Sequence, residues 1–286
     1  MAGKQALGSR PAPQGTLFRK TRLPRRALTR MATNDQRLSR TALVTGAAHG
    51  IGLATAEALL AAGHRVAMVD KDADALRSAA SKLPSDRVLG LVQDVAHLDA
   101  GGNLDEAVRK RWEPVTILVN NAGIPSPRRS ARAAGLLETT LEEWNAVLEV
   151  NLSAALRMCR AFIPFMRERR WGRIVGVSSL AGRSRTYISG VSYMAAKAGL
   201  LALARSIAGE FGSDGITANC VAPGYIDTAM AALHGGEKNA EIAKNIPLGR
   251  AGTPQEVAAA IAFLASEEAG YMTGAVIDVN GGIFMA

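Results

Sequence analysis

The sequence contains few residues that could form cross-links or bind metals. It has only two cysteines, Cys159 and Cys220, and each lies in an apolar stretch that predicts a buried thiol. Cysteine-rich disulfide frameworks are typical of oxidising compartments, so two separate thiols favour a cytoplasmic protein. The four histidines are scattered without the spacing of metal ligands, and we therefore expect no metal site.

Long hydrophobic runs and internal repeats are also missing. The richest apolar stretch, around residues 195–208, is interrupted by Lys197 and Arg205. A membrane-spanning helix needs about 20 predominantly apolar residues, so we expect no membrane segment. With 286 residues, of which 48% are hydrophobic, the chain is nevertheless long enough to bury one large core.

Acidic residues are absent from the first 30 residues, which carry eight lysines and arginines. The rest of the chain has 26 basic against 25 acidic residues, so most of the formal charge of +9 belongs to this segment. A nearly neutral body argues against nucleic-acid binding. We expect residues 1–38 to form a basic, disordered extension and residues 39–286 to form one domain. The extension could be a translated upstream region with Met31 as the true start, an organellar transit peptide, or a basic tail for an acidic partner.

A glycine-rich turn separates the first predicted strand, residues 41–45, from the helical stretch 53–62. Its glycines permit a tight turn, a close approach of backbone to phosphate, and packing of helix on strand. Strand, turn and helix in this order point backbone N–H groups and a helix N-terminus at a pyrophosphate. The predicted nucleotide turn comprises Gly46, His49, Gly50, Ile51 and Gly52.

The second predicted strand, residues 65–70, ends in Asp70, 18 residues after Gly52. A carboxylate there suits hydrogen bonding to the adenosine ribose hydroxyls of NAD, and it repels the 2′-phosphate of NADP. We therefore expect NAD(H) to be preferred over NADP(H). An alternative role for Asp70 is to cap the helix that begins near Asp72.

The most informative pattern is Ser179, followed by Tyr193 and by Lys197 four residues later. A helix over residues 192–211 would place the phenol and the ammonium on one face, one turn apart. A phenol has an ordinary pKa of about 10, and a nearby ammonium lowers it by favouring the phenolate. The pair could then give a proton to a carbonyl oxygen or take one from an alcohol.

With these motifs the chain resembles the short-chain dehydrogenase/reductase family over about residues 40–282. That resemblance implies a single-domain α/β fold, Rossmann-like, with a doubly wound parallel sheet and helices on both faces. It also implies further cofactor contacts after the third and fourth strands and in a loop beside the carboxamide. These further cofactor residues are Asp94, Val95, Asn121, Ala122, Gly123, Pro223, Gly224, Ile226 and Thr228.

The resemblance assigns four catalytic residues. Tyr193 exchanges a proton with the substrate oxygen, while Lys197 lowers the Tyr193 pKa and binds the nicotinamide ribose. Ser179 holds the substrate oxygen, and Asn151, in a helix over about 141–167, anchors a water that links Lys197 to solvent. Ser179 precedes Tyr193 by 14 residues, one more than is usual in the family, so Ser178 stays open as an alternative.

Substrate identity is less well defined. Two segments are expected to shape the substrate pocket, residues 124–140 and residues 225–245. The segment 124–140 contains three arginines that could bind an anionic substrate. The segment 225–245 contains Gly235-Gly236, as a mobile lid would. The arginines are Arg128, Arg129 and Arg132.

The most similar branches reduce 3-oxoacyl groups on acyl carrier protein or oxidise polyols with NAD. Arg170 matches a carrier-docking arginine, but Asp214 stands where a second basic residue is common. We expect an NAD-linked secondary alcohol dehydrogenase or ketone reductase. The 3-oxoacyl reductase is the alternative, and a non-enzymatic NAD-binding regulator is a remote one.

Self-association is expected from two helices with more apolar surface than one sheet can cover. These are residues 192–211 and the helix that holds Asn151. The resemblance implies a homotetramer, or else a homodimer, built by pairing these helices, with strand 275–279 and the tail 283–285 in a second interface.

Overall fold

Seven parallel strands form the centre of the fold. The structure is a computed structural model that describes residues 39–127, 133–186, 188–229 and 244–285. The strands lie in the order β3-β2-β1-β4-β5-β6-β7, so the order reverses between β1 and β4. Their bounds are β1 Thr41–Thr45, β2 Arg65–Asp70, β3 Val88–Val92, β4 Val115–Asn120, β5 Gly172–Val177, β6 Ile216–Pro223 and β7 Val276–Val279.

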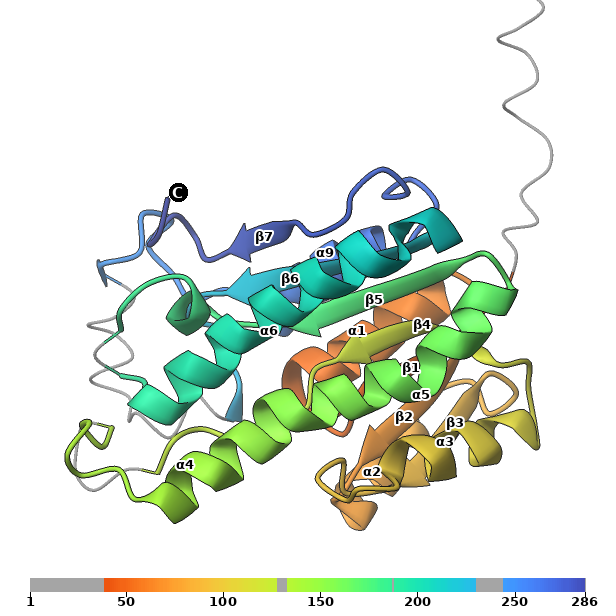
Figure 1. Cartoon of the computed structure of the whole chain (residues 1–286), viewed down its shortest axis with the longest axis horizontal. Coiled ribbons are helices and arrows are strands. Elements are labelled where there is room, and N and C mark those ends of the chain that lie inside the picture. Colours follow the sequence, from red (N-terminus) through yellow and green to blue (C-terminus); the bar gives the residue numbers. More distant parts are fainter. Residues whose placement is uncertain (1–38, 128–132, 187, 230–243, 286) are drawn as a thin grey trace, which may run out of the picture. The chain divides into compact units, whose positions relative to one another are not determined.

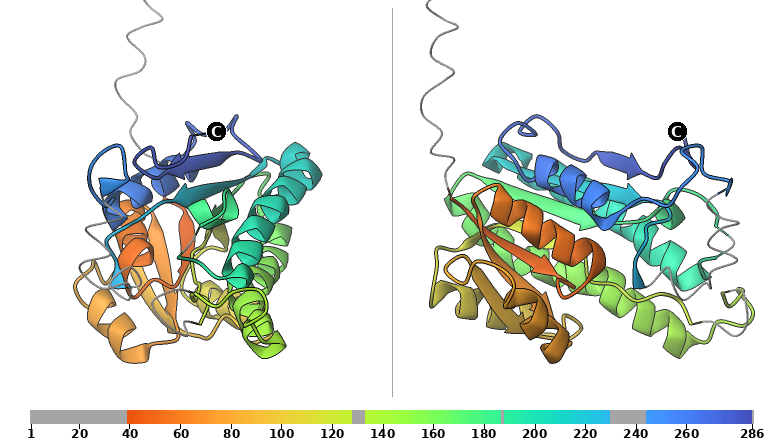
Figure 2. Two further views of the ribbon diagram at one scale, coloured as in Figure 1. Left: turned by 90° about the vertical axis from the view of Figure 1, so that its left-hand side faces the viewer. Right: turned by 180° about the vertical axis from the view of Figure 1, so that it is seen from behind.

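Helices cover both faces of this sheet (Figures 1 and 2). One face carries α1 (Gly50–Ala61), α2 (Ala73–Ala80) and α9 (Pro254–Leu264). The other carries α3 (Ala100–Arg109), α5 (Ala154–Glu168) and α6 (Val191–Phe211), with α4 (Leu141–Leu148) before α5. Short helical turns lie at Glu149–Ser153, Leu180–Gly182 and Gly212–Asp214.

Side chains along each strand point alternately to the two faces of the sheet. In β1, Ala42 and Val44 belong to the apolar cluster under α1 and α9, whereas Leu43 belongs to the cluster under α3 and α5. All five residues of β1 and all six of β4 are buried, as expected for central strands covered on both sides. The predicted α/β doubly wound fold is therefore confirmed.

One predicted element differs from the structure in kind. The sequence predicted a single helix over about 141–167, but a π-helical turn, Glu149–Ser153, interrupts it between α4 and α5. The sequence there has no glycine or proline, so nothing local distinguishes it from a continuing helix. Residues 1–38 lie outside the described residues, so the predicted extension and its boundary stay predictions. Within the described residues, the helices are all too short or too polar to cross a membrane.

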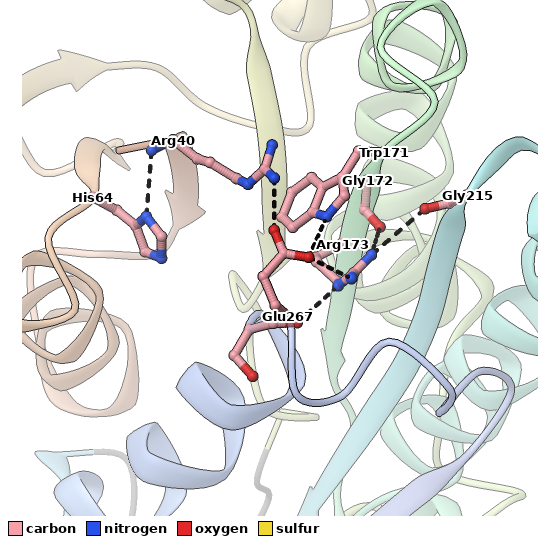
Figure 3. A network of polar contacts seen from close by, with 8 residues as sticks. Arg40, His64, Trp171, Gly172, Arg173, Gly215 and Glu267 are labelled. Carbon is pink, nitrogen blue, oxygen red and sulfur yellow. Dashed lines mark hydrogen bonds and ion pairs between the residues drawn. The ribbon is translucent and has the colours of Figure 1, made fainter. Parts of the chain in front are cut away.

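A cluster of charged and aromatic side chains joins the amino ends of the strands (Figure 3). The Glu267 carboxylate accepts hydrogen bonds from Arg40 at 2.6 Å and from the Trp171 indole at 3.0 Å, and it lies 3.7 Å from the Arg173 guanidinium. Both guanidinium groups lie over the Trp171 ring, 3.5 and 4.3 Å from its centroid. The cluster thereby ties Arg40, just before β1, and Trp171 and Arg173, at the start of β5, to the loop after α9.

Glu267 is the anion that compensates a buried cation in this cluster. Arg173 is only 4% exposed, and burial lowers the pKa of its guanidinium. Burial also acts to raise the pKa of Glu267, but the hydrogen bonds from Trp171 and Arg40 and the charges of Arg40 and Arg173 outweigh it, and the pKa ends below its ordinary value. A carboxyl with a lowered folded-state pKa stabilises the fold above its unfolded pKa and loses that contribution as the pH falls.

We expect Glu267→Gln to lower the free energy of unfolding at pH 7 by about 1 kcal/mol, because the carboxylate is partly exposed and therefore screened. The wild type should then lose more stability than the variant as the pH falls below about 4.3, the ordinary glutamate pKa. Chemical denaturation at pH 7 and at acid pH would measure both effects, with Glu57→Gln on the exposed face of α1 as the control. Parallel stability curves for wild type and Glu267→Gln would contradict this role.

Candidate active site

A cleft of about 450 Å³ opens at the carboxyl ends of the strands. It lies where the strand order reverses between β1 and β4, which is the usual ligand site of open parallel sheets. The structure places every predicted cofactor residue on its wall. These are Gly46, His49, Gly50, Ile51, Gly52, Asp70, Asp94, Val95, Asn121, Ala122, Gly123, Tyr193, Lys197, Pro223, Gly224, Ile226 and Thr228.

The turn after β1 needs its glycines for space and for conformation. Gly46 and Gly50 have φ angles of +65° and +50°, which side chains disfavour. A Cβ on Gly52 would lie 2.0 Å from the Gly46 carbonyl oxygen, so the first turn of α1 packs directly on the strand end. His49 is the N-cap of α1, and its side chain makes no capping hydrogen bond. The N-terminus of α1 therefore faces the cleft and suits a phosphate group.

Asp70 occupies the rim of the cleft at the end of β2. Its two oxygens accept hydrogen bonds from the backbone amides of Ala48 at 3.0 Å and Asp72 at 3.1 Å. The cap of α2 is Asp72, whose side chain accepts from Ala75, so the alternative role of Asp70 as that cap is wrong. Asp70 instead fixes the glycine-rich turn against β2 and presents its carboxylate to the cleft.

The catalytic candidates meet on the opposite side of the cleft. Tyr193 and Lys197 lie one turn apart on α6, with the Lys197 Nζ atom 5.5 Å from the centre of the Tyr193 ring. Ser179, two residues after β5, interacts with the Tyr193 hydroxyl and acts to lower the pKa of the phenol. The Ser179 hydroxyl also accepts a hydrogen bond from the Ala181 amide at 3.1 Å. Ser178 instead donates to the Lys197 carbonyl at 2.7 Å and is buried, so its hydroxyl has a structural partner. The geometry therefore favours Ser179 over Ser178.

Burial shifts the pKa values of Tyr193 and Lys197 in opposite directions. It raises the pKa of Tyr193, an effect that the hydrogen bond with Ser179 only partly offsets. It lowers the pKa of Lys197 to about 8. The Tyr193 pKa thus lies above its ordinary value in this geometry because burial of the phenol is the largest effect, and the predicted lowering by Lys197 stays a prediction. Lys197 is itself buried and donates to the Val177 carbonyl at 2.8 Å.

Asn151 lies in the π-helical turn and is 1% exposed. Its side chain forms two hydrogen bonds with the backbone of Ile124, accepting from the amide at 2.7 Å and donating to the carbonyl at 2.9 Å. The Asn151 oxygen and the Lys197 ammonium both lie 3.3 Å from where a Cβ on Gly123 would be. The structure therefore brings Asn151 beside Lys197; its predicted water contact stays a prediction.

The substrate end of the cleft contains side chains that the sequence did not single out. Ile188 and Ser189, from the loop before α6, line it beside Ser126 and Tyr225, which belong to the two predicted pocket segments. They come from three separate loops, so no spacing along the chain could have brought them together. Arg128, Arg129, Arg132 and the Gly235-Gly236 pair lie outside the described residues. The described residues hold no group of three or more possible metal ligands.

Comparisons with known proteins agree with this geometry. A family model described as enoyl-(acyl carrier protein) reductase matches residues 46–284. The chain is 39% identical to a 3-oxoacyl-[acyl-carrier-protein] reductase of Salmonella typhimurium, over 85% of this chain and 97% of the relative. It is 40% identical to an uncharacterized short-chain type dehydrogenase/reductase of Sinorhizobium fredii, over 86% and 98%.

Solved structures of similar proteins have the same fold and the same kind of description. A 3-oxoacyl-[acyl-carrier protein] reductase of Brucella melitensis superimposes with a TM-score of 0.81 at 36% identity, over 86% of this chain and 92% of that one. A further structure of such a reductase from Brucella melitensis, described with bound NAD, has a TM-score of 0.79 at 35% identity and the same coverage. The chain therefore belongs to the short-chain dehydrogenase/reductase family, and it is an oxidoreductase that acts on CH–OH groups or the corresponding ketones.

Proposed function

We propose that this protein interconverts a ketone and a secondary alcohol with NAD(H). The observation that carries the proposal is the meeting of Ser179, Tyr193 and Lys197 on one wall of a cleft whose other wall is the glycine-rich turn. The cleft fits a dinucleotide for two reasons. The glycines of the turn carry no side chain, so the backbone can approach a phosphate closely, and Asp70 lies where the ribose would bind. When bound, the nicotinamide ring supplies or accepts the hydride.

The side chains of the cleft would handle the proton. The Tyr193 hydroxyl gives a proton to the ketone oxygen in reduction and takes it back in oxidation. Ser179 shares a hydrogen bond with that hydroxyl and orients the same oxygen. Lys197, with a pKa of about 8, supplies positive charge beside the phenol and a donor for the nicotinamide ribose. Asn151 holds the backbone of Ile124, which lines the cleft.

For the substrate we propose a 3-oxoacyl thioester, because the relatives at 39–40% identity include several 3-oxoacyl-[acyl-carrier-protein] reductases. A free secondary alcohol with NAD is the second candidate, and one specific observation favours it. Asp214 forms ion pairs with Arg167 at 2.8 Å and Arg170 at 3.2 Å. This carboxylate offsets one of the two positive charges near the end of α5 that would otherwise attract an acidic carrier protein.

A panel of 3-oxoacyl thioesters, free ketones and secondary alcohols, assayed with NAD(H) and NADP(H), tests the function. Tyr193→Phe keeps the ring and should bind NAD normally, but we expect its turnover to fall by about 10²–10⁴-fold because the proton donor is lost. Ser179→Ala should also lose turnover at unchanged cofactor affinity, whereas Lys197→Ala should lose both.

The panel separates the possible outcomes. Preferred reduction of thioesters supports the 3-oxoacyl reductase, and preferred oxidation of free alcohols supports the second candidate. Near-normal turnover of Tyr193→Phe would overturn the assignment of roles. Binding of NAD without turnover of any substrate would favour the non-enzymatic regulator.

For the cofactor we expect NAD(H) to be used with higher kcat/KM than NADP(H). Asp70 would repel a 2′-phosphate, and like-charge contacts of this kind cost about 1–3 kcal/mol, or about 5- to 150-fold. Asp70→Asn should reduce the preference by relieving that repulsion, while Asp74→Asn, on the exposed start of α2, should leave it unchanged. A wild-type preference for NADPH would contradict the role of Asp70.

For the assembly we propose a homotetramer, or a homodimer, that pairs α5 and α6 with their counterparts. Leu156 on α5 is 45% exposed, and α6 carries exposed Ala198 and Ala202, so both helices leave apolar surface uncovered. Light scattering should show a species larger than one chain; a stable monomer would rule out this arrangement. A cytoplasmic location likewise stays a prediction.

A further inference from the structure

The helix that carries Tyr193 begins without a capping side chain of its own. Its N-cap is Gly190, and the first helical residues are Val191, Ser192 and Tyr193. The amide of the third helical residue normally bonds the side chain of a serine, threonine, aspartate or asparagine at the N-cap. Glycine offers no such group, so the Tyr193 amide must find its acceptor elsewhere.

Ser126 supplies that acceptor from a loop 67 residues earlier in the chain. The Tyr193 backbone amide donates to the Ser126 hydroxyl oxygen at 3.2 Å. The same hydroxyl lies 2.9 Å from the hydroxyl of Ser192, and both serines are buried. Ser126 therefore performs the task of an N-cap residue from a distance, and its bond ends on the backbone of the tyrosine itself.

The segment that holds Ser126 is anchored at Ile124 and stiffened by two prolines. Asn151 holds the backbone of Ile124 through two hydrogen bonds, at 2.7 and 2.9 Å. Pro125 and Pro127 flank Ser126 and restrict its backbone to few conformations. The segment thus forms a short, stiff connection from Asn151 to the amide of Tyr193, and its residues Ile124, Pro125 and Ser126 line the cleft.

The packing at this contact explains why the helix has a glycine cap. A Cβ on Gly190 would lie 2.6 Å from the Ser126 Cβ and 2.7 Å from its hydroxyl oxygen. A serine at position 190 and a serine at position 126 cannot both fit without movement. The capping hydroxyl is therefore supplied by Ser126 on the loop, and the N-cap position of α6 is a glycine because only a residue without a side chain fits beside Ser126.

We propose that Ser126 is a positioning residue. By capping α6 from the segment 124–127 that follows β4, it fixes the position of the Tyr193 hydroxyl. The proposal rests on the proposed function of Tyr193 as the proton donor. A displacement of the first helical turn would move the phenol relative to Ser179 and Lys197, so the effect of losing Ser126 should fall on the catalytic step rather than on cofactor binding.

Three variants test the proposal in the full chain. Ser126→Ala removes the cap and should lower kcat by about tenfold, the equivalent of about 1.4 kcal/mol, with an unchanged Kd for NAD. Ser192→Ala is the matched control, because it also removes the serine–serine contact but keeps the Tyr193 bond, and it should retain kcat. The double variant Ser126→Gly with Gly190→Ser moves the hydroxyl from the loop to the N-cap, where the extended backbone of residue 190 suits it, and should restore most of kcat.

Hydrogen exchange gives a readout that does not need turnover. Exchange at the Tyr193 amide should be faster in Ser126→Ala than in the wild type and in Ser192→Ala, and slow again in the double variant. Unchanged exchange and unchanged kcat in Ser126→Ala would overturn the proposal. Failure of the proposed function would look different, because wild type and Tyr193→Phe would then have equal turnover while the exchange pattern stayed intact. Equal loss of kcat in Ser126→Ala and Ser192→Ala would also contradict positioning through the amide.

Discussion

The hydroxyl of Thr45 accepts hydrogen bonds from the backbone amides of Asn121 and Ala122, both at 3.0 Å, and donates to the Val119 carbonyl at 3.3 Å. The Asn121 side chain returns two bonds, to the carbonyls of Thr45 at 2.8 Å and Gly46 at 3.0 Å. These contacts lock the ends of β1 and β4 together at the point where the strand order reverses. Both halves of the cleft depend on that spacing, since the glycine-rich turn follows β1 and the segment toward Ser126 follows β4.

The two ends of the sheet are stabilised in different ways because they have different tasks. At the amino ends, Glu267 joins two guanidinium groups and an indole into one cluster, and these side chains do not line the active-site cleft. At the carboxyl ends, the polar contacts mostly bind backbone to side chain over short distances, as at Thr45, Asn121 and Asn151. Bonds of that kind satisfy buried backbone groups and fix the chain while leaving the wall of the cleft available to a ligand.

The features that could be predicted from the sequence are those that depend on local spacing. The glycine-rich turn, the end of β2 at Asp70 and the Tyr193–Lys197 pair each lie within one element or at its end, so a period of two or of one helical turn places them. The features that could not be predicted arise from contacts between distant segments. The π-helical turn has no local signal, Lys197 is drawn to the Val177 carbonyl of another element, and the cap of α6 comes from Ser126. The two segments predicted to shape the substrate side include residues 128–132 and 230–243, which lie outside the described residues.

The opposite pKa shifts of Tyr193 and Lys197 determine which protonation form of each group is present at a given pH. A phenol whose pKa is raised by burial stays protonated at neutral pH, and a protonated phenol is the form that gives a proton to a ketone oxygen. Oxidation of an alcohol needs the phenolate, which this burial disfavours and which the Lys197 charge would have to restore. Because the pKa of Lys197 is itself near 8, that charge is reduced at alkaline pH, where a phenolate would otherwise form most easily. The two shifts together leave Tyr193 in its proton-donating form near neutrality, with Lys197 largely charged beside it.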